Sequence, residues 1–502
     1  MALTARHHLA AGSRRPRPVL VLLAFVILAS AAVRLADLDR FTGLVFDEHY
    51  YVHDARVILA GDVGRSGPSP WLPGAEWGHA HPELGKLVIA AGIRLFGDTP
   101  WGWRLPGALA GIATVALVYP LARRLGLPPT ASLAATVLAA SDTLAMAISR
   151  VATLDAQVSL WTAVAVLAAL LHVQAGRRAW LVLLGVAGGL ATATKWSGML
   201  AVLAALLILA VGPRLWPRPG QPSPRSTLAR AGVVAALATL VYVTTYAQYF
   251  LAGHGVGDFL RLQEHMAAFG WGVKGSLTFA SRPATWLFDV QPIWFRWFLN
   301  ERGTVGLLAI GNPVLFWAAT AALVVLAVRA VRTRDAAGDL ALLVVAALYL
   351  PWLLTTRQTY LYYILPAVPF LAIALAAALA PALDGTGLDA PKRRRLPACG
   401  WALGAAAGAA AWPLLSALHA VAASRGATVA AAASLLLAAV IAGWRCRAGC
   451  RPQPQRGRAA AFLAWGLIGL ASGVALALLP FVLGLPVPYS YYDRLMLFTT
   501  WR

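Results

Sequence analysis

The chain has 502 residues, of which 59% are apolar and 12% are charged. An ordinary soluble domain is about 45–50% apolar and about 25% charged. The composition therefore excludes a soluble globular protein, and three cysteines are too few for a disulfide framework. A net charge of +22 would suggest nucleic-acid binding in a soluble chain. Here the basic residues lie mostly in short segments between apolar runs, where they set membrane orientation, so no nucleic-acid partner is predicted.

Apolar runs long enough to cross a membrane recur along the whole chain. A spanning helix needs about 20 mostly apolar residues. The pattern predicts an all-α polytopic membrane protein with about thirteen spans, at 18–37, 104–123, 128–147, 156–173, 179–194, 196–212, 229–251, 305–329, 338–356, 360–383, 398–421, 427–444 and 459–484. The first run follows a basic tail at 1–17 and also resembles a signal peptide with a cleavage site near Ala29. An uncleaved span is favoured, because the rest of the chain is also membrane-embedded.

The apolar run at 84–97 is too short to span. At about 1.5 Å per residue it reaches about 21 Å, against a hydrocarbon core of about 30 Å. If it lies at the outer interface, every basic cluster falls on one side of the membrane: 123–124, 177–178, 214–230, 329–334, 392–395 and 445–458. The N-terminus is then cytoplasmic and the C-terminus extracytoplasmic.

This topology leaves two large outer segments, 38–103 and 252–304. The first is acidic: eight of the twenty acidic residues lie in 37–83, namely Asp37, Asp39, Asp47, Glu48, Asp54, Asp62, Glu76 and Glu83. The region from 398 to 484 carries no polar constellation. We therefore expect a catalytic membrane domain at 18–383 and a further transmembrane region at 384–502.

Two adjacent carboxylates, Asp47 and Glu48, follow the first span closely. One interpretation is a solvated acidic turn that caps the next helix. The other is a general base with an orienting carboxylate, whose pKa would rise towards the working range by partial desolvation at the membrane surface.

Histidines in the same segment raise the question of a metal site. His49 and His53 are spaced i,i+4, and His79 and His81 follow. With Asp47 and Glu48 they could ligate a divalent metal, although interfacial side chains facing lipid headgroups are the favoured interpretation. No cofactor is predicted, and a divalent metal stays open. Cys446 and Cys450 have no companion ligands and are interpreted as cytoplasmic thiols.

Charged residues gather at the predicted outer mouth. In this topology the outer ends of several spans bring Asp47 and Glu48 near Lys86, Arg104, Arg150, Asp155 and Lys195. Acids for proton transfer and cations for a phosphate, at a lipid boundary, suit a lipid-phosphate donor. The alternative is that each arginine snorkels or pairs with a single carboxylate.

Several motifs resemble those of the bacterial, actinobacterial-type protein O-mannosyltransferases of the GT-C fold. The first three are Phe46-Asp47-Glu48-x-Tyr50-Tyr51-Val52-x-Asp54-Ala55, His81-Pro82-x-Leu84-Gly85-Lys86 and Arg104-Leu105-Pro106-x-Ala108-Leu109. Further matches are Ser149-Arg150 with Leu154-Asp155, Lys195-Trp196-Ser197-Gly198, and Tyr362-Tyr363-x-x-Pro366-x-x-Pro369-Phe370. The resemblance covers roughly residues 18–383. It departs from the family at His49, usually Thr, and around Arg282 in the second outer segment.

The resemblance implies an inverting mannosyltransferase. The donor would be a polyprenyl-phosphate mannose and the acceptor a Ser or Thr hydroxyl of an exported protein. Asp47 would be the general base and Glu48 would position its surroundings or the acceptor. Substrate-binding roles fall to Lys86, Arg104, Arg150, Asp155, His81 and Lys195, with the first three facing the leaving phosphate. The enzyme would lie in the bacterial plasma membrane, and association with the protein export machinery is a further expectation.

Two alternatives stay open. A transferase of the same fold could glycosylate a lipid or a cell-wall glycan. A transporter would place ionisable residues at mid-span in broken helices. The charges here gather at one outer face, which disfavours a transporter.

Overall fold

The computed structural model describes residues 17–63, 80–216, 224–272, 278–332, 335–383, 454–497 and 499–501. Within these ranges nine helical segments are long and apolar enough to cross a membrane. They comprise α1 (Arg17–Leu35), α4 (Pro100–Leu125), α7 (Asp155–Ala175), η1 (Trp196–Gly198) with α9 (Met199–Leu215), α10 (Pro224–Thr244), α14 (Pro313–Arg332), α15 (Ala336–Tyr349) with η2 (Leu350–Leu354), η3 (Leu361–Ala367) with α16 (Val368–Leu383), and α20 (Pro454–Leu483). The polytopic helical fold is thus confirmed.

A tenth span is broken. α5 (Pro129–Ala140) and α6 (Thr143–Ser149) meet at an angle of 57°, where one continuous span at 128–147 was predicted. The physical reason is Asp142, whose carboxylate caps α6 by accepting from Ala145 N at 2.7 Å and also accepts from Asn312 N at 3.1 Å. A new helix therefore begins at the break.

Each of the other predicted spans within the described residues coincides with a helix. The helix at 179–194 is α8 (Arg178–Thr194), which is shorter than the others. The span predicted at 305–329 begins later, at Pro313, because its first residues form a β-strand. The runs at 398–421 and 427–444 lie outside the described residues, so the count of thirteen spans stays a prediction.

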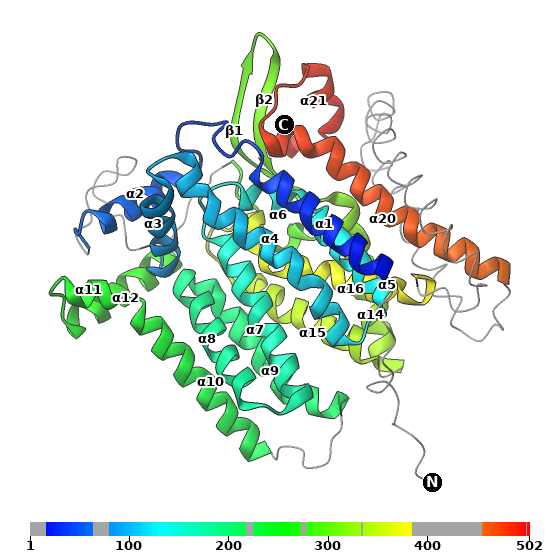
Figure 1. Cartoon of the computed structure of the whole chain (residues 1–502), viewed down its shortest axis with the longest axis horizontal. Coiled ribbons are helices and arrows are strands. Elements are labelled where there is room, and N and C mark those ends of the chain that lie inside the picture. Colours follow the sequence, from blue (N-terminus) through cyan, green and yellow to red (C-terminus); the bar gives the residue numbers. More distant parts are fainter. Residues whose placement is uncertain are drawn as a thin grey trace.

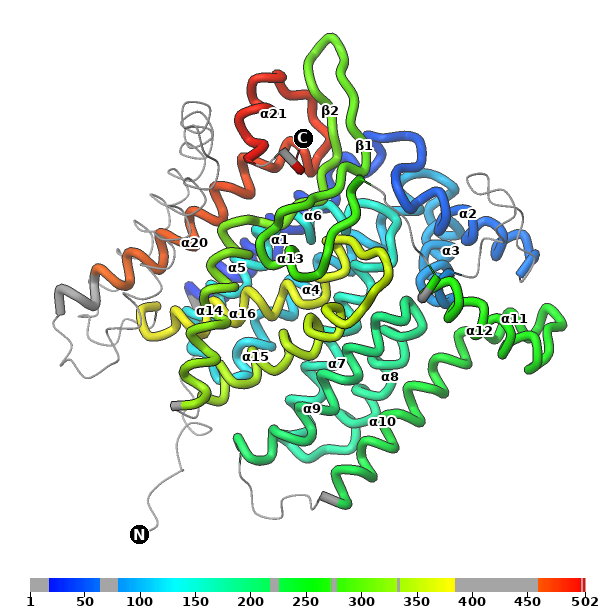
Figure 2. Tube along the Cα trace, turned by 180° about the vertical axis from the view of Figure 1, so that it is seen from behind, coloured from blue at the N-terminus to red at the C-terminus, as the bar shows by residue number. Residues whose placement is uncertain are grey.

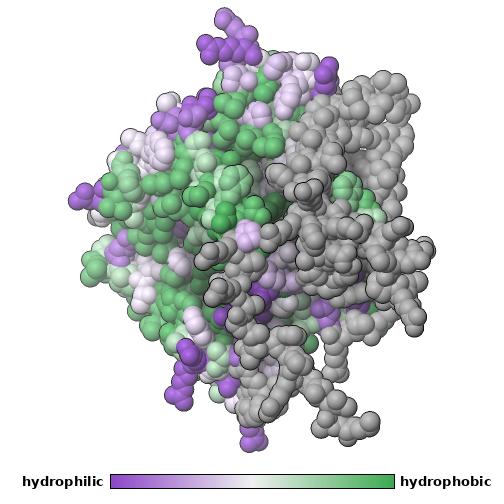
Figure 3. Space-filling view, turned by 45° about the vertical axis from the view of Figure 1, so that its right-hand side comes forward, coloured by the Kyte–Doolittle hydropathy of each residue, from purple (hydrophilic) through white to green (hydrophobic). Residues whose placement is uncertain are grey.

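Close helix packing builds the bundle (Figure 1). α7 packs against α4, α8 and α9, and α16 packs against α5, α14 and α15. The sequence of α16 is apolar on every side, which is typical of a helix enclosed by others, and almost all of it is buried. α1 and α10 are largely exposed at the edge of the bundle. Apolar side chains form a broad band over the described surface, with hydrophilic side chains at its two ends (Figure 3).

The acidic segment forms two helices at one end of the bundle, α2 (Glu48–Leu59) and α3 (Leu84–Phe96). The run predicted as an interfacial helix is α3, which buries Ile89, Ala90 and Ile93 against α2 and α4. A short turn joins α3 to α4, where Thr99 caps the new helix by accepting from Gly102 N at 3.4 Å. The tight turn explains why 84–97 does not cross the bundle.

An unexpected β-hairpin begins in the second predicted outer segment and ends in the span predicted at 305–329. α11 (Ala247–Leu251), α12 (Val256–Gly272) and α13 (Pro283–Trp286) precede β1 (Ile293–Asn300) and β2 (Gly303–Ala309), which pair antiparallel with a bulge between Trp294 and Arg296. The all-α expectation missed this hairpin, because most of β2 is apolar and was counted as the start of the span predicted at 305–329.

The C-terminal residues hold the base of the hairpin (Figure 2). The buried indole of Trp501 in η4 (Thr499–Trp501) donates to the Asp289 carbonyl at 2.9 Å. Trp294 donates to the Trp501 carbonyl at 2.9 Å, and α21 (Tyr489–Leu495) contacts β2. The division of the chain at 383 and 384 stays a prediction, although α20 packs against α5, α14 and α16.

Candidate active site

Asp47 occupies the N-cap position of α2 but makes no capping hydrogen bond there. Its carboxylate instead accepts a hydrogen bond from the Tyr362 hydroxyl at 3.3 Å. Burial raises the pKa of Asp47 to about 7; Lys195 and the Tyr362 hydroxyl oppose this rise and Asp155 adds to it. The geometry favours the base interpretation over a capping turn, because a carboxyl with a pKa near 7 is poised to exchange protons at neutral pH.

Phe46, directly before Asp47, holds an unusual backbone conformation. Its φ is +50°, in the left-handed region that bulky residues rarely adopt. The ring stacks on Phe295 with centroids 4.4 Å apart and lies edge-on to Tyr362 at 5.9 Å. These contacts from β1 and η3 hold the strained residue, so the chain turns sharply at Phe46 and Asp47 enters the site.

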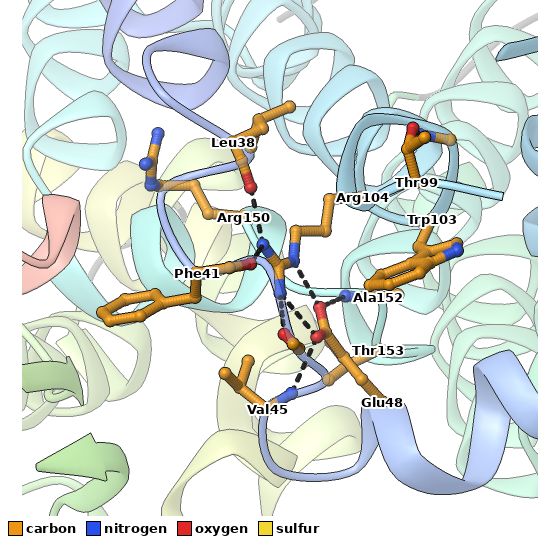
Figure 4. A network of polar contacts seen from close by, with 12 residues as sticks. Leu38, Phe41, Val45, Glu48, Thr99, Trp103, Arg104, Arg150, Ala152 and Thr153 are labelled. Carbon is orange, nitrogen blue, oxygen red and sulfur yellow. Dashed lines mark hydrogen bonds and ion pairs between the residues drawn. The ribbon is translucent and has the colours of Figure 1, made fainter. Parts of the chain in front are cut away.

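Glu48 lies at the centre of a network of polar contacts (Figure 4). Its fully buried carboxylate forms a two-pronged ion pair with Arg104 at 2.7 and 2.8 Å. It also accepts from Val45 N and Ala152 N, both at 2.9 Å. Glu48 therefore joins the loop before α2 to the turn before α7; its role in positioning Asp47 stays a prediction.

Arg104 has no donor left for a substrate. Besides Glu48, its guanidinium donates to three backbone carbonyls of the loop after α1, those of Leu38, Phe41 and Gly43, at 2.6, 2.7 and 3.0 Å. A guanidinium has five N–H donors, and these contacts use all of them. This geometry is against the phosphate contact predicted for Arg104 and makes it the residue around which the loop folds.

Arg150 also differs from its predicted role. Its guanidinium donates to the carbonyls of Val482 at 3.1 Å and Val33 at 2.5 Å, near the C-terminal ends of α20 and α1. Unpaired carbonyls at helix ends attract cations. Arg150 thus caps the C-terminal ends of α20 and α1. Within the described part of the chain it makes no hydrogen bond or ion pair with Asp47.

Asp155 and Lys195 form the second half of the site. The Lys195 ammonium lies 3.0 and 3.1 Å from the two carboxylate oxygens of Asp155, and both side chains are buried. The same ammonium lies over the ring of Tyr363, 4.5 Å from its centroid. Since Lys195 and Asp155 both influence the pKa of Asp47, the three charges form one electrostatic unit.

His81 precedes α3 and Lys86 lies in its first turn. The Lys86 ammonium is buried between Glu83 at 3.2 Å and Asp54 at 3.4 Å. Burial lowers the pKa of His81 well below its ordinary value, and the charges of Lys195, Lys86 and Arg357 lower it further. A neutral imidazole surrounded by cations marks a place suited to an anion.

The structure gives no support to a metal centre. No group of three His, Cys, Asp or Glu side chains within the described ranges could hold an ion. His79, one of the four histidines considered, lies outside those ranges. Of the two candidate carboxylates, Glu48 is instead paired with Arg104.

Two family models match consecutive parts of the chain. The model described as dolichyl-phosphate-mannose-protein mannosyltransferase matches residues 80–246, and the C-terminal four-transmembrane region of protein O-mannosyltransferase matches residues 255–412. The chain belongs to the protein O-mannosyltransferase family. This confirms the family resemblance of the motifs.

Relatives and solved structures agree with this membership. A polyprenol-phosphate-mannose–protein mannosyltransferase of Mycobacterium tuberculosis is 27% identical over 442 residues, covering 74% of this chain and 83% of the relative. An enzyme of the same name from Corynebacterium glutamicum is 28% identical, with 68% and 80% covered.

The fold resembles two solved structures. One is the Saccharomyces cerevisiae Pmt1–Pmt2 complex bound to the sugar donor, with a TM-score of 0.67, 14% identity, and 98% and 93% of the two chains covered. The other is ArnT from Cupriavidus metallidurans bound to undecaprenyl phosphate, with a TM-score of 0.55, 20% identity, and 95% and 78% covered. The predicted GT-C fold is thereby confirmed.

Three residues that the structure gathers around Asp47 and Lys195 were not predicted as site residues: Tyr362, Tyr363 and Arg357. The two tyrosines belong to a motif of the family resemblance, but their spacing alone does not show that they reach Asp47. Arg357 carries no motif. It follows the last turn of η2, and its guanidinium lies 5.9 Å from the Tyr363 ring centroid. Its position after a predicted span is the one signal that could have found it.

Glu48→Gln should destabilise the protein, whereas Asp47→Asn should not. Removing one partner of a buried ion pair costs about 3–5 kcal/mol, and Glu48 is the buried partner of Arg104. We expect thermal unfolding of the purified protein in detergent to show a lower midpoint for Glu48→Gln and an unchanged midpoint for Asp47→Asn. An unchanged midpoint for both variants would contradict the positioning role of Glu48.

Proposed function

We propose that this chain is an inverting transferase that moves mannose from a polyprenyl-phosphate mannose to a Ser or Thr hydroxyl of an exported protein. The observation that carries the proposal is the partly buried Asp47 carboxylate beside Lys195, with a pKa of about 7. The names of the relatives and the family membership support the sugar, the donor and the protein acceptor.

The reaction needs one base and one stabilised leaving group. Asp47 takes the proton from the acceptor hydroxyl as its oxygen forms a bond to the anomeric carbon. The bond between that carbon and the phosphate oxygen breaks on the opposite face, so the configuration inverts. Both electrons of that bond leave with the polyprenyl phosphate, whose charge must then be stabilised by cations.

Arg357 and Lys195 are the cations best placed for the phosphate. Lys195 uses two contacts on Asp155 and faces the tyrosine pair. Among the residues that the structure describes, the Arg357 side chain makes one hydrogen bond, from Nε to the Gln358 carbonyl at 3.4 Å. Its two terminal nitrogens therefore suit a phosphate. His81, neutral and close to both cations, completes this anion-binding side.

The orientation proposed for the membrane follows the basic clusters. The ends of α4 and α9 that carry Arg123, Arg124 and Arg214 would face the cytoplasm, and α2, α3 and the hairpin would face outwards. In a bacterium this places the site on the outer face of the plasma membrane. Association with export machinery stays a prediction.

The proposal is tested by transfer and donor binding on the same purified proteins. Radiolabelled polyprenyl-phosphate mannose and a Ser/Thr-rich peptide are the substrates. A positioned base contributes about 10² to 10⁴-fold, so Asp47→Asn should lose that much transfer while binding the donor normally. Transfer to a lipid or glycan fraction instead of the peptide would favour the alternative acceptor, and full activity of Asp47→Asn would remove the mechanism.

The pH dependence should report Asp47. Because the carboxylate is the active form and its pKa is about 7, kcat/KM should fall about tenfold per pH unit below pH 7 and level off above it. Asp155→Asn removes a negative charge that raises this pKa, so the midpoint of the profile should move to lower pH. A midpoint that stays in place in Asp155→Asn would show that another group titrates.

Arg357→Gln should slow transfer by about 10² to 10³-fold if its guanidinium stabilises the leaving phosphate. Arg357→Lys should recover part of the rate, because the charge remains and the planar fork is lost. The control is Arg261→Gln on α12, an exposed arginine paired with Asp258. Near-normal turnover of Arg357→Gln in well-folded protein would exclude Arg357 from the phosphate site.

A further inference from the structure

One edge of β1 has no backbone partner in the part of the chain that the structure describes. β1 pairs with β2 along its other edge. The far edge of β2 is paired at one residue, where Thr304 and Val487 exchange backbone hydrogen bonds of 2.8 and 2.9 Å. The open edge lies on the side of the loop that joins α1 to α2 (Figures 1 and 2).

Near its start, β1 contacts the residue that directly precedes Asp47. Phe295 of β1 stacks on Phe46, and Asp47 follows Phe46 in the chain. One residue further along, the Arg296 guanidinium lies 5.4 Å from the ring centroid of Phe41, in the same loop. From Phe295 to Asn300 the strand then runs outwards for about 17 Å, at about 3.3 Å per residue.

The outer part of the edge, beyond Arg296 and the bulge, lacks the usual protection. Natural edge strands carry lysine, proline or bulges that prevent pairing with another chain. The sequence of β1 has neither lysine nor proline, and its bulge lies at the base, between Trp294 and Arg296. The outer half is exposed, with Leu299 at 58%. Such an edge is a template for a further extended chain.

We propose that β1 binds the acceptor polypeptide as an added strand and so presents a Ser or Thr hydroxyl to Asp47. The inference rests on the proposed function and names the surface that the acceptor uses. The bound ligand is an extended segment of the acceptor polypeptide, because the open edge of β1 offers backbone N–H and C=O groups as far as Phe295, which contacts the residue before Asp47. Strand addition recognises the backbone of a peptide, so it tolerates many side chains around the modified hydroxyl.

Backbone methylation of the acceptor tests the strand. In a β-strand the N–H groups of alternate residues face the same neighbour. A Thr peptide is therefore N-methylated at one position at a time and mannosylated by the full-length enzyme in membranes. Methylation at alternate positions should raise KM about tenfold, which is the effect of losing one hydrogen bond. Methylation at the intervening positions should change KM by no more than about twofold, and kcat should stay within about twofold throughout.

The outcomes separate this inference from the proposed function. Normal transfer with no effect of N-methylation, or with an equal effect at every position, would overturn the role of β1. Failure to mannosylate any unmethylated peptide would instead contradict the proposed function. Because the change is made in the peptide, loss of enzyme folding does not interfere.

A crosslink locates the peptide on the enzyme. Leu299→Cys is made in a variant whose Cys399, Cys446 and Cys450 are replaced by Ser, and the peptide carries Cys four residues from its Thr. The control is Tyr489→Cys on α21, 56% exposed but on the β2 side of the hairpin. We expect disulfide formation at position 299 and little at 489. Equal yields at both positions, or crosslinks between two enzyme copies in place of the peptide, would overturn the proposal.

Discussion

The buried ion pair between Glu48 and Arg104 is the constraint on which the active site depends. Charges removed from water are stable only when every donor and acceptor is matched, and here five guanidinium donors and the carboxylate are all satisfied. Matching them requires the loop after α1 to wrap around Arg104 and the turn at Ala152 to lie against Glu48. The position of Asp47 follows from this arrangement, because Asp47 immediately precedes the fixed residue. Two neighbouring acids thus have separate tasks, one structural and one chemical.

Strain at Phe46 connects the base to the outer hairpin. A bulky residue with positive φ costs about 1–3 kcal/mol, and it persists because Phe295 and Tyr362 hold the ring from both sides. One of these partners belongs to β1 and the other donates to Asp47. The Phe46 ring therefore contacts both the hairpin, through Phe295, and the hydrogen-bond partner of Asp47, which is Tyr362. This arrangement gives a physical basis for coupling acceptor binding on β1 to the orientation of the base.

The sequence predicts this fold better than it predicts the roles of its arginines. Apolar length and basic clusters are properties of the chain alone, so the helices and the gathering of Asp47, Asp155 and Lys195 could be foreseen. Arg104 and Arg150 were expected at a phosphate, yet apart from the Glu48 carboxylate their hydrogen-bond partners are backbone carbonyls. Every residue offers a carbonyl, so no residue pattern shows which ones a guanidinium will reach. The hairpin was missed for another reason, because β2 is nearly as apolar as the helix that follows it and was counted as part of the same span.

Charge balance at the site links donor binding to the strength of the base. Lys195 lowers the pKa of Asp47, while Asp155 raises it. A phosphate close to Lys195 adds negative charge near Asp47 and so raises the pKa of this carboxyl further. The carboxylate then binds the hydroxyl proton more tightly when the donor is present than when it is absent. A bound donor therefore makes the Asp47 carboxylate a stronger base but lowers the fraction of Asp47 that is ionised near neutral pH, so the rate depends on how far Lys195 balances the phosphate charge.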